Sequence, residues 1–310
     1  MTDPVEPLPH VGFGCWAIGG HGYGTVDDSE SVGAVEAAWE MGIRLFDTAD
    51  VYGFGHSETI LSQGLGARRH DALIATKGGV IWDDRGRTAK DCSPAALQDA
   101  LDGSLRRLGL DCIPLYQIHW PDGNTPTAVI LETLEKFRQD GKVRWIGCSN
   151  FGPAELTDTA ERSGFDTIQL PFNLIRRGNE PFMRECQDAG LRTLVYDVLA
   201  RGLLADKFSM DTIWEPNDSR ATDPGFQGMA YEQGLQVARN MRRIGDRLGK
   251  EPAQVALRWT IQTEAVDCML VGCKTADQVC ENAKALSWRL SPQDMAEIEA
   301  LVSDSQGIVQ

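Results

Sequence analysis

The sequence is poor in the features that mark disulfide-stapled, zinc-binding or membrane-spanning proteins. Its eight cysteines form no CxxC pair, and no spacing of cysteine and histidine resembles a zinc site. The first residues hold no basic segment followed by an apolar one, and no apolar run is long enough to cross a bilayer. We therefore expect a cytoplasmic protein with reduced thiols, no membrane partner and no bound metal.

Positive charge is also scarce. The 310 residues contain 45 acidic and 30 basic side chains, which gives a formal net charge of −15. Such a surface repels a phosphate backbone, so nucleic acid is not expected as a partner. A nucleotide cofactor would need a local group of basic side chains. With 42% hydrophobic and 24% charged residues, the composition is that of a folded globular chain.

Short apolar runs alternate with longer amphipathic ones along the whole chain. Alternation at this spacing favours a parallel sheet, and eight such units suit an α/β fold of the (β/α)8 TIM-barrel type. The alternative is an open doubly wound sheet, but the GxGxxG fingerprint that often marks it is missing. The eight expected strands are 11–16, 43–48, 72–77, 113–120, 143–149, 167–172, 191–197 and 266–272.

No linker interrupts this alternation, so we expect residues 1–310 to form a single domain. The longest irregular stretch, 200–234, follows the seventh strand and is rich in Pro, Asp, Asn and Gly, as a long loop would be. An additional helix is expected near the C-terminus at 291–304. Its start, "SPQD", carries a capping serine and a proline at the first helical position.

Polar residues stand where three consecutive strands end. Asp47, Lys77 and His119 end strands two, three and four, and Tyr52 follows in the loop after strand two. The active site of a (β/α)8 barrel lies at this end of the strands. Taken singly, Asp47 could cap a loop and His119 could be an ordinary interior histidine. Together, the four predict one polar cluster in the barrel mouth.

This combination of side chains suits proton transfer to a carbonyl. A tyrosine with a pKa near 10 needs a nearby cation to exchange protons at neutral pH. Lys77 can supply that cation, and a lysine on the inner end of a strand needs a partner such as Asp47. His119 can hydrogen-bond a carbonyl oxygen. The cluster is therefore predicted to donate a proton and to polarise a carbonyl.

Several motifs agree in order and spacing with one known family. They are "FDTADVYGFGHSE", "ATKGG", "LYQIHWPD", "GKVRWIGCSNF", "LARGLL" and "DQVCENA". Across nearly its whole length the sequence resembles the aldo-keto reductases. The "NLIRRG" and "HWPDGNTP" stretches are most similar to the bacterial branch that includes inositol-catabolism reductases.

The resemblance implies roles for the cluster. Tyr52 would be the general acid that protonates the carbonyl oxygen, and Lys77 would lower its pKa. Asp47 would pair with Lys77, and His119 would orient the carbonyl. The implied reaction is NADPH-dependent reduction of an aldehyde or ketone, reversible as alcohol oxidation by hydride transfer.

The resemblance also implies a cofactor site. Ser149, Asn150 and Gln169 would hold the nicotinamide carboxamide, and Tyr196 would stack on the ring. A basic residue near the 2′-phosphate favours NADP(H) over NAD(H), and Lys274 is the candidate. The pyrophosphate would pass Leu199, Arg201, Gly202 and Leu203. The adenosine would lie at Gly272, Cys273, Lys274, Thr275, Gln278, Glu281 and Asn282. The expected cofactor-binding residues also include Gly14, Cys15, Trp16 and Asp47.

Two residues depart from the family pattern. Asp197 stands on the pyrophosphate path, where its charge would repel phosphate, so we expect it to point away or to be paired. Val271 stands where proline is usual. Arg201, Lys274 and Arg220 are the candidates for local positive charge.

The substrate pocket is expected to have aromatic walls, which accept the apolar faces of many carbonyl compounds. Any one of these aromatics could instead pack against a loop. A keto sugar, a cyclic ketone and an aldehyde all remain possible small-molecule substrates. The candidate lining residues are Trp16, Tyr23, Phe54, Trp82, Trp120 and Arg177.

Two other functions are compatible with the same residues. The protein could be an NADP-binding regulatory or redox-sensing subunit with little turnover. It could also be a Schiff-base aldolase that uses Lys77 as its nucleophile. The aldolase hypothesis explains the lysine but leaves Tyr52 and the cofactor motifs without a role.

Overall fold

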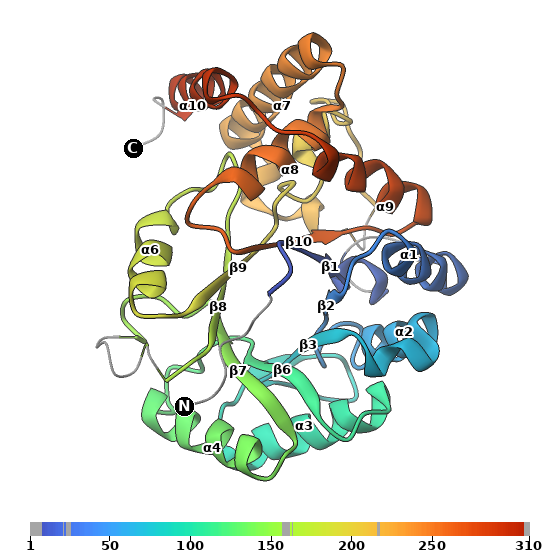
Figure 1. The fold of residues 1–310 in the computed structure, drawn as a ribbon, viewed down its shortest axis with the longest axis vertical. Helices are drawn as coiled ribbons and strands as arrows, with labels where there is room; N and C mark the ends of the chain where they lie inside the picture. Colours follow the sequence, from blue (N-terminus) through green and yellow to red (C-terminus); the bar gives the residue numbers. More distant parts are fainter. Residues whose placement is uncertain are drawn as a thin grey trace.

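Eight parallel strands close into a barrel, in agreement with the predicted (β/α)8 fold (Figure 1). The computed structural model describes residues 8–306 except 21, 23–25, 157–161, 163, 216 and 217. Around the barrel the strands follow the order β1, β10, β9, β8, β7, β6, β3, β2. Their bounds are β1 Val11–Gly14, β2 Leu45–Asp47, β3 Leu73–Gly78, β6 Ile113–Ile118, β7 Val143–Ser149, β8 Thr167–Pro171, β9 Arg192–Tyr196 and β10 Cys268–Gly272.

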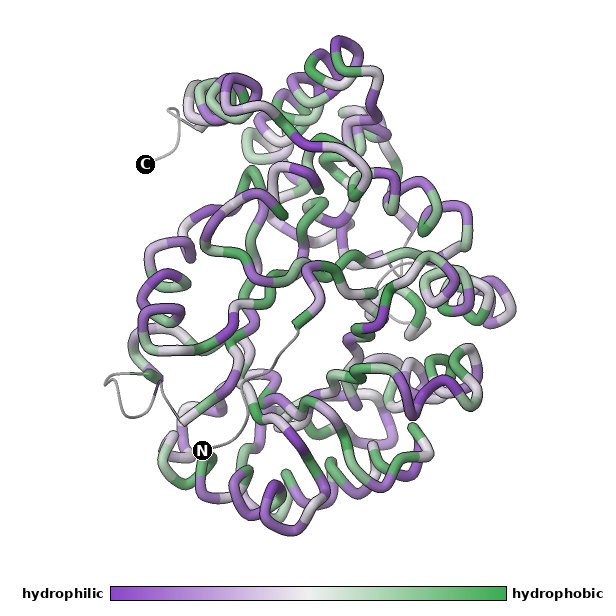
Figure 2. The backbone as a smooth tube through the Cα atoms, in the orientation of Figure 1, coloured by the Kyte–Doolittle hydropathy of each residue, from purple (hydrophilic) through white to green (hydrophobic). Residues whose placement is uncertain are grey.

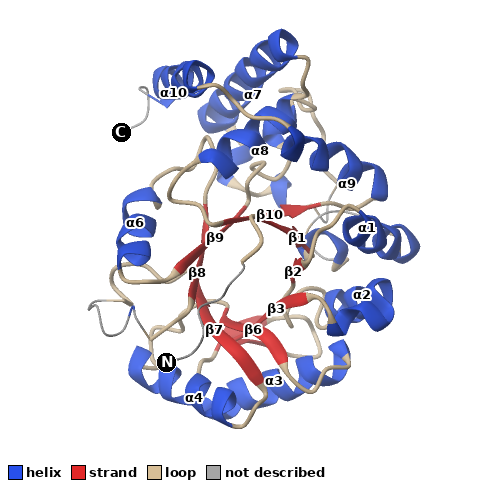
Figure 3. Cartoon of the chain, viewed as in Figure 1, coloured by secondary structure: helices blue, strands red, loops and turns tan. Residues whose placement is uncertain are grey.

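Helices surround the barrel, as the cartoon of Figure 3 shows. Along these helices hydrophobic and hydrophilic residues alternate, as expected of amphipathic helices that pack through one face (Figure 2). No helix in the described part of the chain is long and apolar enough to cross a membrane. The helices are α1 Asp28–Glu40, α2 His56–Leu65, α3 Pro94–Leu108, α4 Thr127–Gln139, α6 Glu180–Asp188, α7 Gly228–Leu248, α8 Pro252–Gln262, α9 Ala276–Ala283 and α10 Pro292–Gln306.

Local sequence signals explain where helices begin and end. The Ser93 side chain accepts a hydrogen bond from the Ala96 amide and Pro94 follows at the first helical position, so α3 begins there. The same helix ends at Gly109, whose φ of +64° terminates it at little cost because glycine has no Cβ. The expected C-terminal helix is present as α10, which packs against α7.

Two segments differ from the sequence prediction. The loop expected over 200–234 ends earlier, because α7 begins at Gly228 and buries Tyr231 and Leu235 on one face. Three short 3₁₀ turns, Leu203–Ala205, Ser219–Ala221 and Pro224–Phe226, interrupt the rest of it. In addition, an antiparallel hairpin of β4 (Val80–Trp82) and β5 (Thr88–Lys90) follows β3. Strands of three residues are too short to produce a recognisable period.

The lumen of the barrel is filled by layers of side chains. One layer is apolar: Leu45, Ala75, Leu115, Leu194, Cys268 and Leu270 form a buried cluster of their own. Side chains of a strand alternate between its two faces, so the residue two positions further on faces the lumen again, one level closer to the C-terminal ends. At that level Asp47 follows Leu45, and Lys77 follows Ala75. The lumen thus changes from apolar to charged within a single step along β2 and β3.

Candidate active site

A buried ion pair lies at the centre of the polar layer. The Lys77 ammonium donates to both carboxylate oxygens of Asp47 at 2.8 Å and to the Thr48 carbonyl at 2.9 Å. Gln169 donates to the same carboxylate at 2.7 Å. Lys77 is fully buried. A buried charge is tolerated when it is paired and hydrogen-bonded. The two neighbouring strands therefore bring Asp47 and Lys77 together, as the sequence predicted.

Tyr52 lies directly above this pair. Lys77 Nζ is 5.2 Å from the centroid of the Tyr52 ring, and the ring meets His119 edge-on with centroids 5.4 Å apart. The glycine-rich run after Tyr52 places the loop there: a Cβ on Gly53 would lie 1.9 Å from the Gly19 carbonyl oxygen. Only glycine lets this turn pack so closely against the loop after β1. All four predicted catalytic residues meet in one place.

The phenol of Tyr52 differs from the sequence expectation in its acidity. Lys77 was expected to lower the Tyr52 pKa. Instead burial, and then the negative charge of Asp47, raises this pKa well above its usual value of 10.0. Burial has the largest effect because it penalises the charged phenolate, and the negative charge of Asp47 adds to it. Tyr52 therefore holds its proton at neutral pH.

The imidazole of His119 is neutral. Burial, followed by the charges of Lys77 and Lys90, lowers its pKa well below 6.5. Its ring nitrogen Nδ1 is buried and has no hydrogen-bond partner. A neutral imidazole carries one donor and one acceptor nitrogen. It can thus hydrogen-bond a carbonyl oxygen without adding a charge to the site.

Four predicted nicotinamide contacts form a hydrogen-bonded row beside the catalytic cluster. Asn150 donates to the His119 carbonyl and to Ser149 Oγ, both at 3.0 Å, and accepts from the Tyr196 hydroxyl at 2.8 Å. The Asn150 amide also donates to the Gln169 carbonyl. With a φ of +61°, Asn150 has a backbone conformation that few residues other than glycine adopt easily. This row fixes β6, β7, β8 and β9 relative to one another at the mouth.

The opposite rim is formed by the ends of β1 and β10 together with the loop after β9. Gly14 and Gly272 are paired across the two strands, and the Cys15 amide donates to the Asp47 carbonyl at 2.8 Å. The Trp16 ring stacks on Tyr52 with centroids 6.2 Å apart. The guanidinium carbon of Arg201 lies 5.4 Å from the centroid of the same Trp16 ring. Residues of the expected cofactor set therefore adjoin Tyr52 directly.

The segment after β9 is backbone-strained. Asp197, Ala200 and Arg201 all have positive φ values, between +48° and +61°. Such strain concentrates at ligand clamps and active sites. Asp197 accepts a hydrogen bond from the Arg201 amide at 2.8 Å, so the acid is paired, as expected. Burial raises its pKa from 3.8 to about 6. Arg201 itself forms an ion pair with Asp223 at 2.7 Å.

The expected adenosine end lies at the start of α9. Thr275 caps this helix, and the Lys274 amide donates to Gln278 Oε1 at 2.8 Å. Lys274 is half-buried, and burial together with the charge of Arg220 lowers its pKa. Arg220 is held by both carboxylate oxygens of Asp218. Two cations therefore lie close together on this side of an acidic protein.

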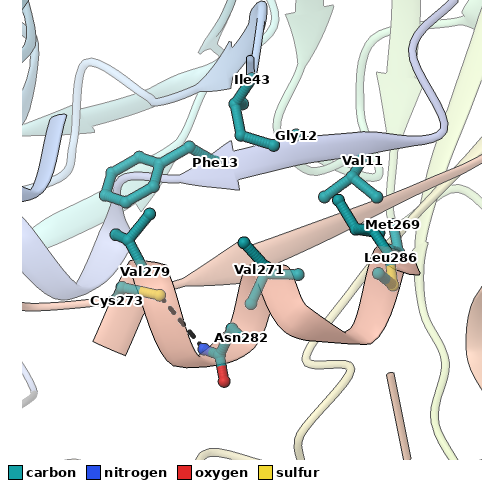
Figure 4. A pocket seen from close by; sticks show the side chains of 11 residues that line it. Val11, Gly12, Phe13, Ile43, Met269, Val271, Cys273, Val279, Asn282 and Leu286 are labelled. Atoms are coloured by element: carbon teal, nitrogen blue, oxygen red, sulfur yellow. Dashed lines mark hydrogen bonds between the residues drawn. The ribbon is translucent and has the colours of Figure 1, made fainter. Parts of the chain in front are cut away.

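Two further predicted contacts on α9 are occupied by neighbouring side chains. Glu281 forms an ion pair with Lys284, and the Asn282 amide donates to Cys273 Sγ at 3.3 Å (Figure 4). That bond borders an apolar cavity of about 30 Å³, which includes Phe13, Val271 and Val279 in its lining. The cavity lies beneath α9, behind β1 and β10, and it is too small for a carbonyl substrate.

Two of the sequence assignments need correction. Arg177 does not lie at the mouth: it forms ion pairs with Glu299 of α10 and Glu180 of α6, and it stacks over Trp259. Its role is to tie α10 to the barrel. The Leu203 side chain is buried with Phe226, Tyr231 and Leu235, so only its backbone can face the pyrophosphate path.

Of the other substrate candidates, Trp16 lies against Tyr52 on the rim described above, and Tyr23 lies outside the described residues. The rings of Phe54 and Trp82 are 5.9 Å apart, which places the β4–β5 hairpin against the loop that carries Tyr52. Trp120, next to His119, is 38% exposed. These three rings remain candidates for the predicted aromatic wall.

Sequence reasoning missed a group of buried charges behind this wall. Glu58 is fully buried and accepts from Arg107 and from Thr76, both at 2.6 Å. Asp50 is 1% exposed, and no side chain in the described part of the chain donates a hydrogen bond to its carboxylate. Burial, followed by the charge of Glu58, raises the Asp50 pKa well above 3.8. Asp50 belongs to the same "FDTADVYG" run as Asp47 and Tyr52, but nothing in that run distinguishes a buried acid from a loop acid.

Comparison with known proteins assigns the architecture to a family. The family model described as the aldo/keto reductase family matches residues 10–303. The chain belongs to the aldo/keto reductase family. It is accordingly an oxidoreductase that interconverts carbonyl compounds and alcohols, a class that typically depends on NAD(P).

Individual relatives cover nearly the whole chain. An aldo-keto reductase from Bacillus subtilis is 31% identical, with 98% of this chain and 93% of the relative covered. An NADH-specific methylglyoxal reductase from Escherichia coli is 30% identical, with 93% and 92% covered.

Solved structures share the fold. A glycerol dehydrogenase from Gluconobacter oxydans is 34% identical, covers 98% of this chain and 95% of its own, and superposes with a TM-score of 0.88. An aldo/keto reductase from Klebsiella pneumoniae, solved with NADP and acetate, is 25% identical, with 95% and 92% covered and a TM-score of 0.75.

Proposed function

We propose that this protein is an NADPH-dependent carbonyl reductase, reversible as an alcohol dehydrogenase, in which Tyr52 is the general acid and base. The observation that carries the proposal is the state of the cluster. A protonated phenol lies beside a neutral imidazole and above a fixed ion pair. This is the set of groups that carbonyl reduction needs on the protein side.

Each residue of the cluster has its own role in the proposed carbonyl reduction. His119 hydrogen-bonds the carbonyl oxygen and brings it to the Tyr52 hydroxyl. Tyr52 then donates its proton to that oxygen, while the carbonyl carbon becomes an alcohol carbon. The Lys77 ammonium, 5.2 Å from the ring, favours the phenolate that remains. Asp47 and the Thr48 carbonyl keep Lys77 in place throughout.

The rim residues fit a dinucleotide. Asn150, Ser149 and Gln169 offer amide and hydroxyl groups beside His119, and the Tyr196 ring is fixed by its bond to Asn150. The strained loop at Arg201 and the cations Lys274 and Arg220 suit the phosphates of such a cofactor. When bound, NADPH supplies the hydride that reduces the carbonyl carbon.

The preference for NADPH rests on Lys274 beside Arg220. We expect NADPH to give the higher kcat/KM with any accepted carbonyl, and Lys274→Ala to lower kcat/KM for NADPH about tenfold while changing that for NADH little. The measurement is initial-rate kinetics with both cofactors. A higher kcat/KM for NADH in the wild type would refute the preference. The comparison is informative because one relative is named as NADH-specific.

The reaction itself is tested by following NADPH oxidation with keto sugars, cyclic ketones and aldehydes at fixed pH, with identification of the alcohol formed. A regulatory subunit would bind NADPH and oxidise it only at a very slow single-turnover rate across the whole panel. Steady turnover with at least one substrate is the outcome that we expect.

The aldolase alternative is disfavoured by Lys77 itself. Its ammonium is fully buried and has three acceptors within 2.9 Å, whereas a Schiff-base lysine must be neutral and reachable. Borohydride in the presence of a carbonyl substrate should therefore leave no carbon attached to Lys77. The partners of the proposed reaction are the cofactor and a small-molecule carbonyl substrate.

A further inference from the structure

The β4–β5 hairpin brings a cation to the substrate side of the mouth. Lys90 ends β5, and its ammonium lies 4.6 Å from the centroid of the Trp120 ring. The charge of this ammonium reaches His119, whose pKa it helps to lower. Lys90 is therefore close to the imidazole that would receive the carbonyl oxygen, although it plays no part in the mechanism above.

The position of the hairpin is fixed by contacts on both sides. It leaves the barrel directly after Gly78, at the end of the strand that carries Lys77. Past β5 the Asp91 amide returns to the Gly79 carbonyl at 3.1 Å, and Cys92 Sγ donates to the Trp120 carbonyl at 3.3 Å. Lys90 is thus held between the end of β3 and the residue that follows His119.

The charge of Lys90 is not cancelled by an ion pair within the described part of the chain. Two carboxylates lie nearby in the sequence and the fold, and both are engaged by loop groups. Asp91 accepts from the Ser93 amide, and Asp122 accepts from the Cys92, Asn124 and Thr125 amides and from the Thr125 hydroxyl. The second mouth cation, Lys77, is neutralised by Asp47.

The surroundings of Lys90 are apolar and open. Trp120 is 38% exposed. Val80 is the cross-strand partner of Lys90, so Trp82, two residues further on, lies on the same face of the hairpin, and its ring packs against that of Phe54. A substrate that lies against these rings places its far end beside the solvent-exposed ammonium group of Lys90.

We propose that Lys90 makes the carbonyl site selective for aldehydes or ketones that carry a carboxylate. This inference rests on the proposed function, because it names the substrate class of the same site. The carbonyl would meet Tyr52 and His119, and the carboxylate would meet Lys90 above Trp120. On a chain of net charge −15, such a local cation is what allows an anionic substrate to approach.

The test compares each acid with its own methyl ester. Aliphatic oxo-acids of increasing length and their esters are assayed with NADPH, and the acid-to-ester ratio of kcat/KM is measured for the wild type and for Lys90→Met. We expect the ratio to fall roughly two- to fivefold in the variant, mainly through KM for the acid, since an exposed ion pair contributes up to about 1 kcal/mol. Lys90→Arg should keep most of the wild-type ratio.

Arg85→Met is the matched control. It removes one positive charge from the turn between β4 and β5 of the same hairpin and should change the ratio less than twofold. An acid-to-ester ratio that changed less than twofold in Lys90→Met, or equally in both variants, would overturn the role of Lys90. Turnover of the esters in the same assay would still support the proposed function. If neither acids nor esters supported NADPH oxidation in the wild type, the proposed function would fail and this inference with it.

Discussion

Two neighbouring layers of side chains in the barrel lumen have opposite characters. Leu45, Ala75 and Leu194 belong to an apolar layer, and two residues further along the same strands stand Asp47, Lys77 and Tyr196. Asp47 and Lys77 are as buried as the apolar layer, and Tyr196 is partly buried. On one barrel strand, a residue of the apolar layer therefore contributes to stability, and the residue two positions further on contributes to the proposed chemistry. Mutations two residues apart should affect stability and turnover separately.

The largest effect is expected from removing the cation of the polar layer. Lys77→Met leaves the Asp47 carboxylate buried with Gln169 as its remaining side-chain donor. An uncompensated buried charge costs about 3–5 kcal/mol of stability. Loss of the cation beside Tyr52 should also lower kcat by roughly 10³-fold or more.

Denaturant unfolding and steady-state kinetics measure the two effects of Lys77→Met separately. A variant that lost neither stability nor turnover would show that the polar layer is not organised around this ion pair.

The apolar layer should respond in the opposite way. Leu194 is fully buried, so Leu194→Ala is expected to cost about 2–5 kcal/mol in the free energy of unfolding through lost burial and the cavity left behind. Because Tyr196 and Asp47 keep their own hydrogen bonds, kcat should change less than about threefold. Chemical denaturation and turnover below the unfolding transition provide the comparison. A loss of kcat as large as that of Lys77→Met would erase the distinction between the layers.

A pH-dependent effect is expected at Asp197, beside the mouth. Its pKa is raised from 3.8 to about 6 in the folded protein. A raised carboxyl pKa means that the unfolded chain loses its proton first as pH rises. The associated stability is fully present below about pH 4 and is lost as pH rises through 6, by up to about 3 kcal/mol.

Asp197→Asn removes this titration while keeping a side chain that accepts from the Arg201 amide and tolerates a positive φ. The stability of the variant relative to the wild type should therefore rise between pH 4 and pH 6. Unfolding free energies at several pH values test this. A difference that stayed constant across this range would contradict the assigned pKa.

The contrast between what the sequence predicts and what it does not has a physical basis. The barrel was predictable because eight apolar runs alternate with helical periods, and the catalytic cluster because polar residues end adjacent strands. The pKa of Tyr52 was not predictable, since it depends on how deeply the folded barrel buries the phenol and on the negative charge of Asp47 beside it.

Long-range side-chain partners were equally hidden. Arg177 is paired with Glu299, 122 residues further along the chain, and no local pattern relates the two. The β4–β5 hairpin, which brings Lys90 to Trp120, lies in a stretch whose charged residues look like an ordinary loop. These contacts depend on packing between elements rather than on any local period.

The most direct measurement of the central claim is turnover of Tyr52→Phe with NADPH and an accepted carbonyl, together with a fluorescence titration of NADPH binding. The substitution removes only the hydroxyl, and the ring contacts with Trp16 and His119 can remain. The account predicts a fall in kcat of roughly 10³-fold or more, with the Kd for NADPH within about threefold of the wild type. Wild-type turnover in Tyr52→Phe would contradict it.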